Sequence, residues 1–160
     1  MYHEMVANEF EERVYDTYLQ EWKAEVDETS TARMYKHVKF YFGFENYLNM
    51  YNAAFRVAIT RIRLSSHLFH VERGRWGRRR IALEDRVCTQ CLTVEDEYHC
   101  IIECVRYLEE RKGCLPDNLR TKPSMFEFVK YFKCKDNTDF KKMGLLCFKI
   151  MKKHKEYLLL

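Results

Sequence analysis

The chain has 160 residues, of which 47% are hydrophobic and 32% charged, a composition typical of one globular domain or two very small ones. Its net charge of +4 is the sum of four bands of unlike sign. Residues 1–55 carry five basic and ten acidic side chains, 56–80 eight against one, 81–110 two against eight, and 111–160 thirteen against five. This banding excludes a uniformly basic tail and a simple acidic solvating protein.

Several other classes are excluded by composition. No apolar run approaches the roughly 20 residues that span a bilayer, and the first residues lack the basic start and apolar stretch of a signal peptide. Five glycines and two prolines argue against a turn-rich β-sandwich and against disorder. The seven cysteines are an odd number, which in such a chain predicts reduced thiols and a cytoplasmic or nuclear protein.

Hydrophobic spacing predicts a mainly α fold, a small helical domain with an irregular zinc-knuckle insertion. From Glu4 to about Val26 the apolar residues recur every four positions, as in one face of a helix. Further helices are expected over residues 32–41, 53–67, 98–110, from Ser124 onward, and over 140–157. We divide the chain into an N-terminal helical segment (1–70), a basic loop with the zinc knuckle (71–110) and a C-terminal helical segment (111–160), which together form one compact domain.

The irregular region contains the most specific pattern of the sequence, Cys-x2-Cys-x7-His-x4-Cys. Its members are Cys88, Cys91, His99 and Cys104. Two residues between the first thiolates allow a tight turn to direct both sulfurs at one ion, and four such ligands suit tetrahedral Zn²⁺. We therefore predict one structural zinc site without an open coordination position. The alternative is a group of buried core cysteines with a satisfied histidine.

A second alternative concerns the third ligand. Cys100 follows His99 directly and lies four residues before Cys104, so that a site of four cysteines is also allowed. We prefer His99, because a buried spare thiol at position 100 is unremarkable. The other cysteines, at 114, 134 and 147, show no pairing logic and are interpreted as core or surface thiols.

Arginine is concentrated immediately before the predicted site. Candidate nucleic-acid contacts are Arg61, Arg63, Arg73, Arg75, Trp76, Arg78, Arg79 and Arg80. Arginine donates bidentate hydrogen bonds to phosphate, and tryptophan offers a face on which an unpaired base can stack. The alternative is a solvated charged face or a nuclear-localisation patch. The acidic run Glu95-Asp96-Glu97 is expected to be solvated or paired with these arginines, and the C-terminal lysines to form the solvated face of a packed helix.

Short motifs follow one another over residues 56–107. They are Arg61-Ile-Arg63 with His67, Glu72-Arg-Gly-Arg-Trp76, Arg86-Val-Cys-Thr-Gln-Cys91, Val94-Glu-Asp-Glu-Tyr-His99 and Glu103-Cys104. Their order resembles the C-terminal zinc-binding region of non-LTR (LINE-type) retrotransposon reverse transcriptases. The resemblance implies a CCHC zinc knuckle, with Cys88, Cys91, His99 and Cys104 as ligands, that helps to bind RNA or a DNA target.

The catalytic parts of that family are missing from this sequence. It has no Tyr-x-Asp-Asp motif of a polymerase and no Pro-Asp…Asp-x-Lys arrangement of a nuclease. We therefore expect a non-catalytic module that binds RNA or single-stranded DNA. Two rivals remain: a protein–protein adaptor in which zinc only stabilises the fold, and a nuclease remnant. A protein partner is possible and no membrane association is expected.

Overall fold

The computed structural model confirms a mainly α fold. It describes residues 2–29, 31, 33–39, 41–76, 79–120, 122–133 and 137–159, without the side chains of residues 2–8 and 137. The α-helices are α1 (Tyr2–Glu28), α2 (Arg33–Val38), α3 (Ala53–Arg63), α4 (His70–Arg73), α5 (Leu108–Arg111), α6 (Met125–Phe132) and α7 (Asn137–Tyr157). Shorter turns are η1 (Asn46–Asn49), η2 (Leu83–Asp85), η3 (His99–Glu103), η4 (Val105–Tyr107) and η5 (Asp117–Leu119). Within these ranges the only β pairing is an isolated antiparallel bridge between Val87 and Val94.

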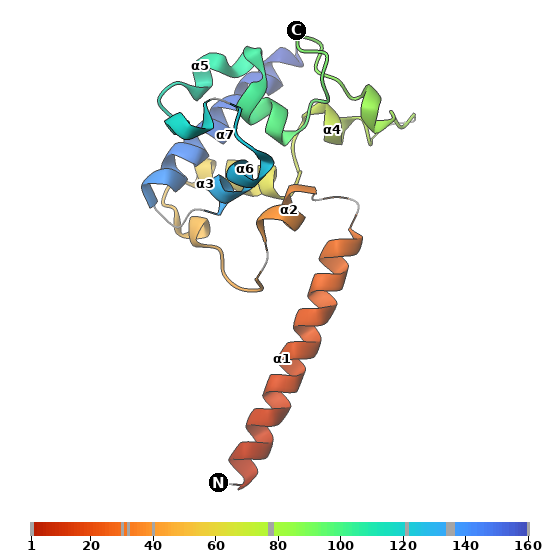
Figure 1. The fold of residues 1–160 in the computed structure, drawn as a ribbon, viewed down its shortest axis with the longest axis vertical. Coiled ribbons are helices and arrows are strands. Elements are labelled where there is room, and N and C mark those ends of the chain that lie inside the picture. Colours follow the sequence, from red (N-terminus) through yellow and green to blue (C-terminus); the bar gives the residue numbers. More distant parts are fainter. Residues whose placement is uncertain are drawn as a thin grey trace.

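The centre of the fold is the packing of α3 against α7 (Figure 1). Ile59 and Ile62 of α3 and Ile150 of α7 are fully buried in the common core, as the spacing of apolar residues in 53–67 predicts for α3. Gly144 of α7 allows the close approach, because a Cβ built at this position would stand 2.6 Å from Cβ of Phe55. Two helices that are far apart in the sequence therefore share one core.

Helix α3 ends at Arg63, four residues before the predicted end at His67. The backbone of Ser65 has a φ of 50°, in the left-handed region that a continuing helix does not use. The Ser65 side chain is buried and donates a hydrogen bond to Oε1 of Glu97 at 2.6 Å. A partner from a distant segment thus fixes the turn that ends the helix.

Helix α6 begins where the sequence predicts. Ser124 Oγ accepts a hydrogen bond from the Glu127 backbone N–H at 3.2 Å, and Glu127 Oε2 accepts one from the Ser124 N–H at 2.9 Å. This reciprocal capping box satisfies two otherwise unpaired donors at the start of the helix. The following turns bury Phe128 and Phe132 in the core.

Helix α1 projects away from the rest of the molecule (Figure 1). Its attachment lies in its C-terminal half, where Tyr18 and Trp22 pack edge-on against Phe42 with ring centroids 5.3 and 5.7 Å apart. The predicted helix over 4–26 is confirmed, and most of its described side chains are exposed.

No helix among the described residues combines the length and the apolar character that crossing a bilayer requires.

The single helix predicted over 98–110 is wrong. The chain forms the wide π turn η3, which ends at Glu103, and Cys104 then adopts an extended backbone with a ψ of 122°. Turn η4 and helix α5 follow in a new direction. The break falls on a cysteine of the predicted metal site, whose N–H donates to the carbonyl oxygen of His99 at 2.7 Å.

Candidate metal centre

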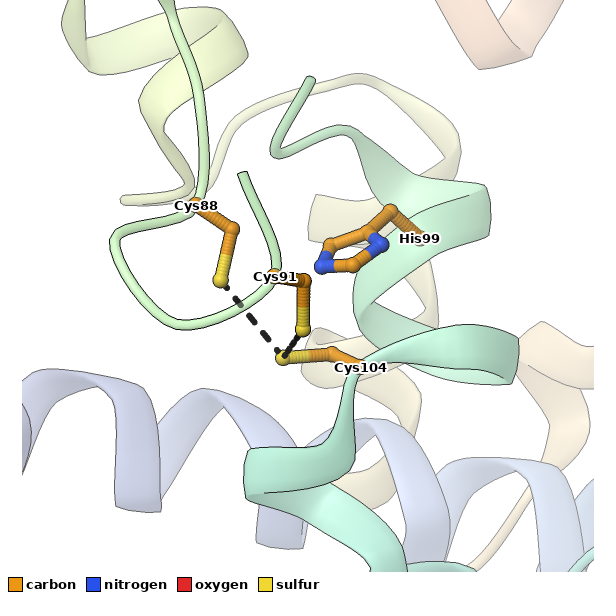
Figure 2. Close-up of side chains that lie close together, drawn as sticks. All are labelled: Cys88, Cys91, His99 and Cys104. Atoms are coloured by element: carbon orange, nitrogen blue, oxygen red, sulfur yellow. Dashed lines mark hydrogen bonds between the residues drawn. The ribbon is translucent and has the colours of Figure 1, made fainter. Parts of the chain in front are cut away.

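A short hairpin positions Cys88 and Cys91. The Cys88 N–H donates to the Thr93 carbonyl oxygen at 2.7 Å, and the Leu92 N–H donates to the Cys88 carbonyl oxygen at 2.8 Å. Leu92 closes this loop with a φ of 57°, a left-handed conformation that glycine adopts more easily than leucine. The turn places both thiols on the same side of the hairpin (Figure 2).

The other two residues come from the following segment. Asp96 Oδ1 accepts a hydrogen bond from the His99 N–H at 2.8 Å and thereby caps the turn that carries the imidazole. The extended backbone of Cys104 then brings its thiol back toward the hairpin (Figure 2). Because η3 is a wide turn that stops at Glu103, His99 and Cys104 face the same point.

The four side chains of the predicted CCHC set converge, as Figure 2 shows. Their potential ligand atoms all lie within 4.8 Å of one another. Cys104 Sγ is 3.8 Å from Cys88 Sγ and 3.9 Å from Cys91 Sγ. A tetrahedral ion with metal–sulfur bonds of about 2.3 Å holds its sulfurs about 3.8 Å apart. The cluster can therefore hold a metal ion with little rearrangement.

The imidazole of His99 is oriented as a metal ligand requires. Its Nδ1 lies 3.1 Å from Thr93 Oγ1 and 3.5 Å from Glu103 Oε2, and both oxygens can accept a hydrogen bond from the Nδ1–H. Its Nε2 is buried and has no hydrogen-bond partner. A buried polar atom without a partner is costly unless something binds it. The residues present thus fit a metal, with Nε2 as the coordinating atom and Nδ1 held from outside.

Cys100, the alternative third ligand, is fully buried but does not belong to this cluster. Burial raises the pKa of its thiol well above the ordinary value, which suits an uncharged core residue. Burial also raises the pKa of Cys104 to about 12, and a divalent cation would replace the proton there. Cys114 and Cys147 are buried core thiols, whereas Cys134 lies outside the described residues.

The expectation of a solvated or arginine-paired acidic run is wrong for Glu95 and Glu97. Both are buried. Glu97 Oε1 lies 2.9 Å from His67 Nε2, and Glu95 Oε1 accepts a hydrogen bond from the His70 N–H at 2.8 Å. Burial raises the pKa of Glu97, but the hydrogen bond and charge of His67 outweigh burial and leave the pKa below its usual range. Sequence reasoning missed these contacts, because the two partners are 30 and 25 residues away.

Of the candidate nucleic-acid contacts, the exposed ones are Arg61, Arg73, Trp76, Arg79 and Arg80. Trp76 has 57% of its surface exposed. Arg75 is half-buried beside Glu72, with Nη1 3.4 Å from the carboxylate, and Arg78 lies outside the described residues.

Arg63 does not reach the surface. It is 2% exposed, its Nη2 lies 2.9 Å from Glu45 Oε2, and its Nη1 donates to the Phe132 carbonyl oxygen at 2.8 Å. These partners occupy the guanidinium in the core, so that Arg63 holds α3 to two other segments and offers no contact to a phosphate.

Arg86 connects the arginine-rich loop to the hairpin that carries Cys88 and Cys91. Its Nη1 donates to the Val71 carbonyl oxygen at 2.8 Å, and its Nη2 donates to that of Ile81 at 2.7 Å. The side chain passes directly over Gly74, where an added Cβ would stand 2.8 Å from Cγ and Cδ of Arg86. The side chain of Arg86 therefore packs two motifs together that are separate in the sequence, Glu-x-Gly-Arg-Trp and Arg-x-Cys-x-x-Cys.

A comparison of the chain with models of protein families, with curated proteins and with solved structures finds no match.

Proposed function

We propose that this protein is a non-catalytic nucleic-acid-binding module, specific for RNA or single-stranded DNA and stabilised by one structural zinc ion. The observation that carries the proposal is the exposure of Arg73, Trp76, Arg79 and Arg80 on a loop that packs against the hairpin of the metal centre. The proposal includes an origin in retrotransposon reverse transcriptases, which the motifs of residues 56–107 resemble.

The donor set favours zinc among the common metals. Three thiols and one imidazole are soft or borderline ligands, which suit Zn²⁺ and disfavour Mg²⁺ and Ca²⁺. Four protein ligands complete a tetrahedral shell and leave no position for a reactive water. The ion would therefore have a structural role, holding the hairpin and the segment after Cys104 together.

The exposure of the arginines to solvent supports nucleic-acid binding over the adaptor function. An adaptor would be favoured if the arginines were buried against the acidic run of residues 95–97. Instead, Arg73, Arg79 and Arg80 are exposed, and the buried Glu97 is engaged by Ser65 and His67. Charged side chains that remain in solvent beside an exposed indole suit phosphate contact and base stacking.

The metal is tested by zinc analysis of the purified protein and of three variants, of which Cys100→Ser is the control for Cys104→Ser. Wild type and Cys100→Ser should each carry one equivalent of zinc, whereas Cys104→Ser and His99→Ala should lose it. Loss in Cys100→Ser with retention in His99→Ala would establish the four-cysteine site instead. Wild-type protein without metal, after growth and purification with zinc, would refute the centre.

Nucleic-acid binding is tested by fluorescence anisotropy with a labelled single-stranded RNA at salt concentrations between about 50 and 300 mM. Affinity should fall steeply with salt, and Arg79→Ala/Arg80→Ala should flatten the log–log slope by about 0.7 per lost phosphate contact. Trp76→Ala should cost about 1–3 kcal/mol of binding free energy. Arg120→Ala, at an exposed arginine paired with Asp117, is the control and should bind like wild type. Affinity that does not change with salt contradicts the proposal.

The nuclease alternative is tested separately by incubation of the same RNA and a single-stranded DNA with Mg²⁺. We expect no cleavage. Cleavage that disappears when a pair of clustered acidic residues is changed would overturn the non-catalytic assignment.

A further inference from the structure

An open groove of about 730 Å³ lies between α3 and α7. Its apolar lining includes Val57, Leu68 and Phe148, which are 47%, 40% and 37% exposed. Its basic lining includes Arg61, Lys152 and Lys155, and none of the described residues around it is acidic. An exposed apolar groove with a basic border suits a ligand that is apolar on one side and acidic on its flanks.

Helix α1 has these properties. Its sequence, Tyr2–Glu28, contains nine acidic and two basic side chains. Phe10, Val14 and Tyr18 recur at intervals of four residues and form a stripe on one face, with 67%, 53% and 55% of their surfaces exposed. Tyr18 meets the Phe42 ring of its own chain at one edge, but more than half of the surface of each of the three side chains stays in solvent. An apolar stripe exposed in this way lacks the packing that normally stabilises a helix.

The α1 helix of the same chain does not cover the groove. Figure 1 shows α1 leaving the body beside α2, with its N-terminal end far from α3 and α7. The apolar stripe and the apolar groove therefore stay exposed together in one copy of the protein.

We propose that α1 of a second copy lies in the α3–α7 groove, with Phe10, Val14 and Tyr18 against the apolar floor and its acidic flanks beside Arg61, Lys152 and Lys155. Each copy has one helix and one groove, so that the reciprocal exchange closes a two-fold symmetric dimer without free ends. The arrangement is a helix-in-groove interface. It does not rest on the proposed nucleic-acid function, but the two proposals share Trp76, which also lines the groove.

Charge favours the pairing of α1 with the groove over the pairing of α1 with a second α1. Two α1 helices side by side would bring together two strongly acidic surfaces, whereas the groove offers basic groups only among its described charged residues. Like charges in contact oppose association, and opposite charges assist it.

The test is a pair of charge reversals, with mass measured by sedimentation or light scattering without nucleic acid. The groove variant is Lys152→Glu/Lys155→Glu and the helix variant is Glu11→Lys/Glu21→Lys, all at exposed positions. Wild type should be a dimer, and each variant alone should dissociate at least tenfold more readily. An equimolar mixture should form a heterodimer, because each helix then meets a groove of opposite charge. Lys141→Glu/Lys142→Glu, on the same helix but outside the groove, should remain dimeric, and circular dichroism should show every variant folded.

Two results would overturn the proposal. A monomeric wild type excludes the dimer. A groove variant that dimerises as tightly as wild type shows that the groove is not part of the interface. If the wild type is monomeric and its groove variant binds RNA less tightly, the groove belongs to the nucleic-acid surface instead. A failure of the nucleic-acid proposal is distinguishable, because Arg79→Ala/Arg80→Ala should change RNA binding and leave the dimer intact.

Discussion

The hydroxyl of Tyr107 lies 2.6 Å from Nδ1 of His154, and this contact joins the segment after the Cys/His cluster to helix α7. On the other side of the same ring, Nε2 lies 3.1 Å from the Leu68 carbonyl oxygen. The two contacts define the tautomer: Nε2–H donates to the carbonyl, and Nδ1 accepts from the phenol. One buried neutral imidazole therefore connects three segments of the chain.

This arrangement predicts a pH dependence of stability. Burial lowers the pKa of His154 below its ordinary value of 6.5, although Glu95 opposes the shift. The unfolded chain then binds a proton at a higher pH than the folded chain does, so that the free energy of unfolding falls as the pH drops below about 6.5. His154→Gln should cost about 1–3 kcal/mol at pH 8. The difference between wild type and variant should shrink toward pH 5.5 in urea unfolding. A pH-independent difference contradicts the buried neutral imidazole.

The contact between Thr93 and His99 predicts an effect on metal affinity from a residue that is not itself a ligand. Thr93→Val removes the acceptor that holds Nδ1, and the loss of such a partner should weaken zinc binding about 10–100-fold. Competition with a chelating dye measures the change. Thr89→Val alters the same loop in the same way, but its hydroxyl contacts Tyr157 instead, and its zinc affinity should match wild type. Equal affinities for all three proteins would show that Glu103 alone suffices to orient the ring.

The packing of Arg86 over Gly74 predicts a strong coupling between the two residues. Gly74 has an ordinary helical φ of −68°, so that alanine there would by itself stabilise the chain by about 0.4–1 kcal/mol. Here, however, the new methyl group would meet the Arg86 side chain, whose guanidinium is held by the carbonyl oxygens of Val71 and Ile81. Gly74→Ala should therefore lower the free energy of unfolding by about 1–3 kcal/mol. In an Arg86→Ala background the cost should disappear. A double-mutant cycle by urea unfolding measures this coupling free energy. Additive effects of the two substitutions would mean that a methyl group at position 74 does not clash with Arg86.

The conformation of Leu92 predicts a stabilising substitution. Its φ of 57° costs a leucine roughly 1 kcal/mol, and its side chain is 77% exposed, so that little packing is lost on truncation. Leu92→Gly should raise the free energy of unfolding by about this amount, whereas Leu92→Ala retains the Cβ and should not. Thermal unfolding of the zinc-loaded protein distinguishes them. Stabilisation by both variants would place the cause in the exposed leucine side chain instead.

Local patterns in the sequence determined most of the helices and the ligand spacing. The four-residue recurrence from Val6 to Trp22 predicts α1, and Ser124 with Glu127 predicts the start of α6. The spacing of Cys88, Cys91, His99 and Cys104 predicts the cluster that the fold brings together. Such features depend on residues within a few turns of one another, and these the chain order specifies directly.

Only the tertiary structure decided which charged residues face solvent and where the helices stop. Arg63 and Arg73 look alike in the sequence, yet Glu45 and Phe132, the latter 69 positions away, hold Arg63 in the core while Arg73 stays exposed. The buried carboxylate of Glu97 is satisfied by Ser65 and His67, which are 32 and 30 residues away in the sequence. A buried charge is tolerated only where partners satisfy it, and those partners come from segments that the folded chain alone brings together.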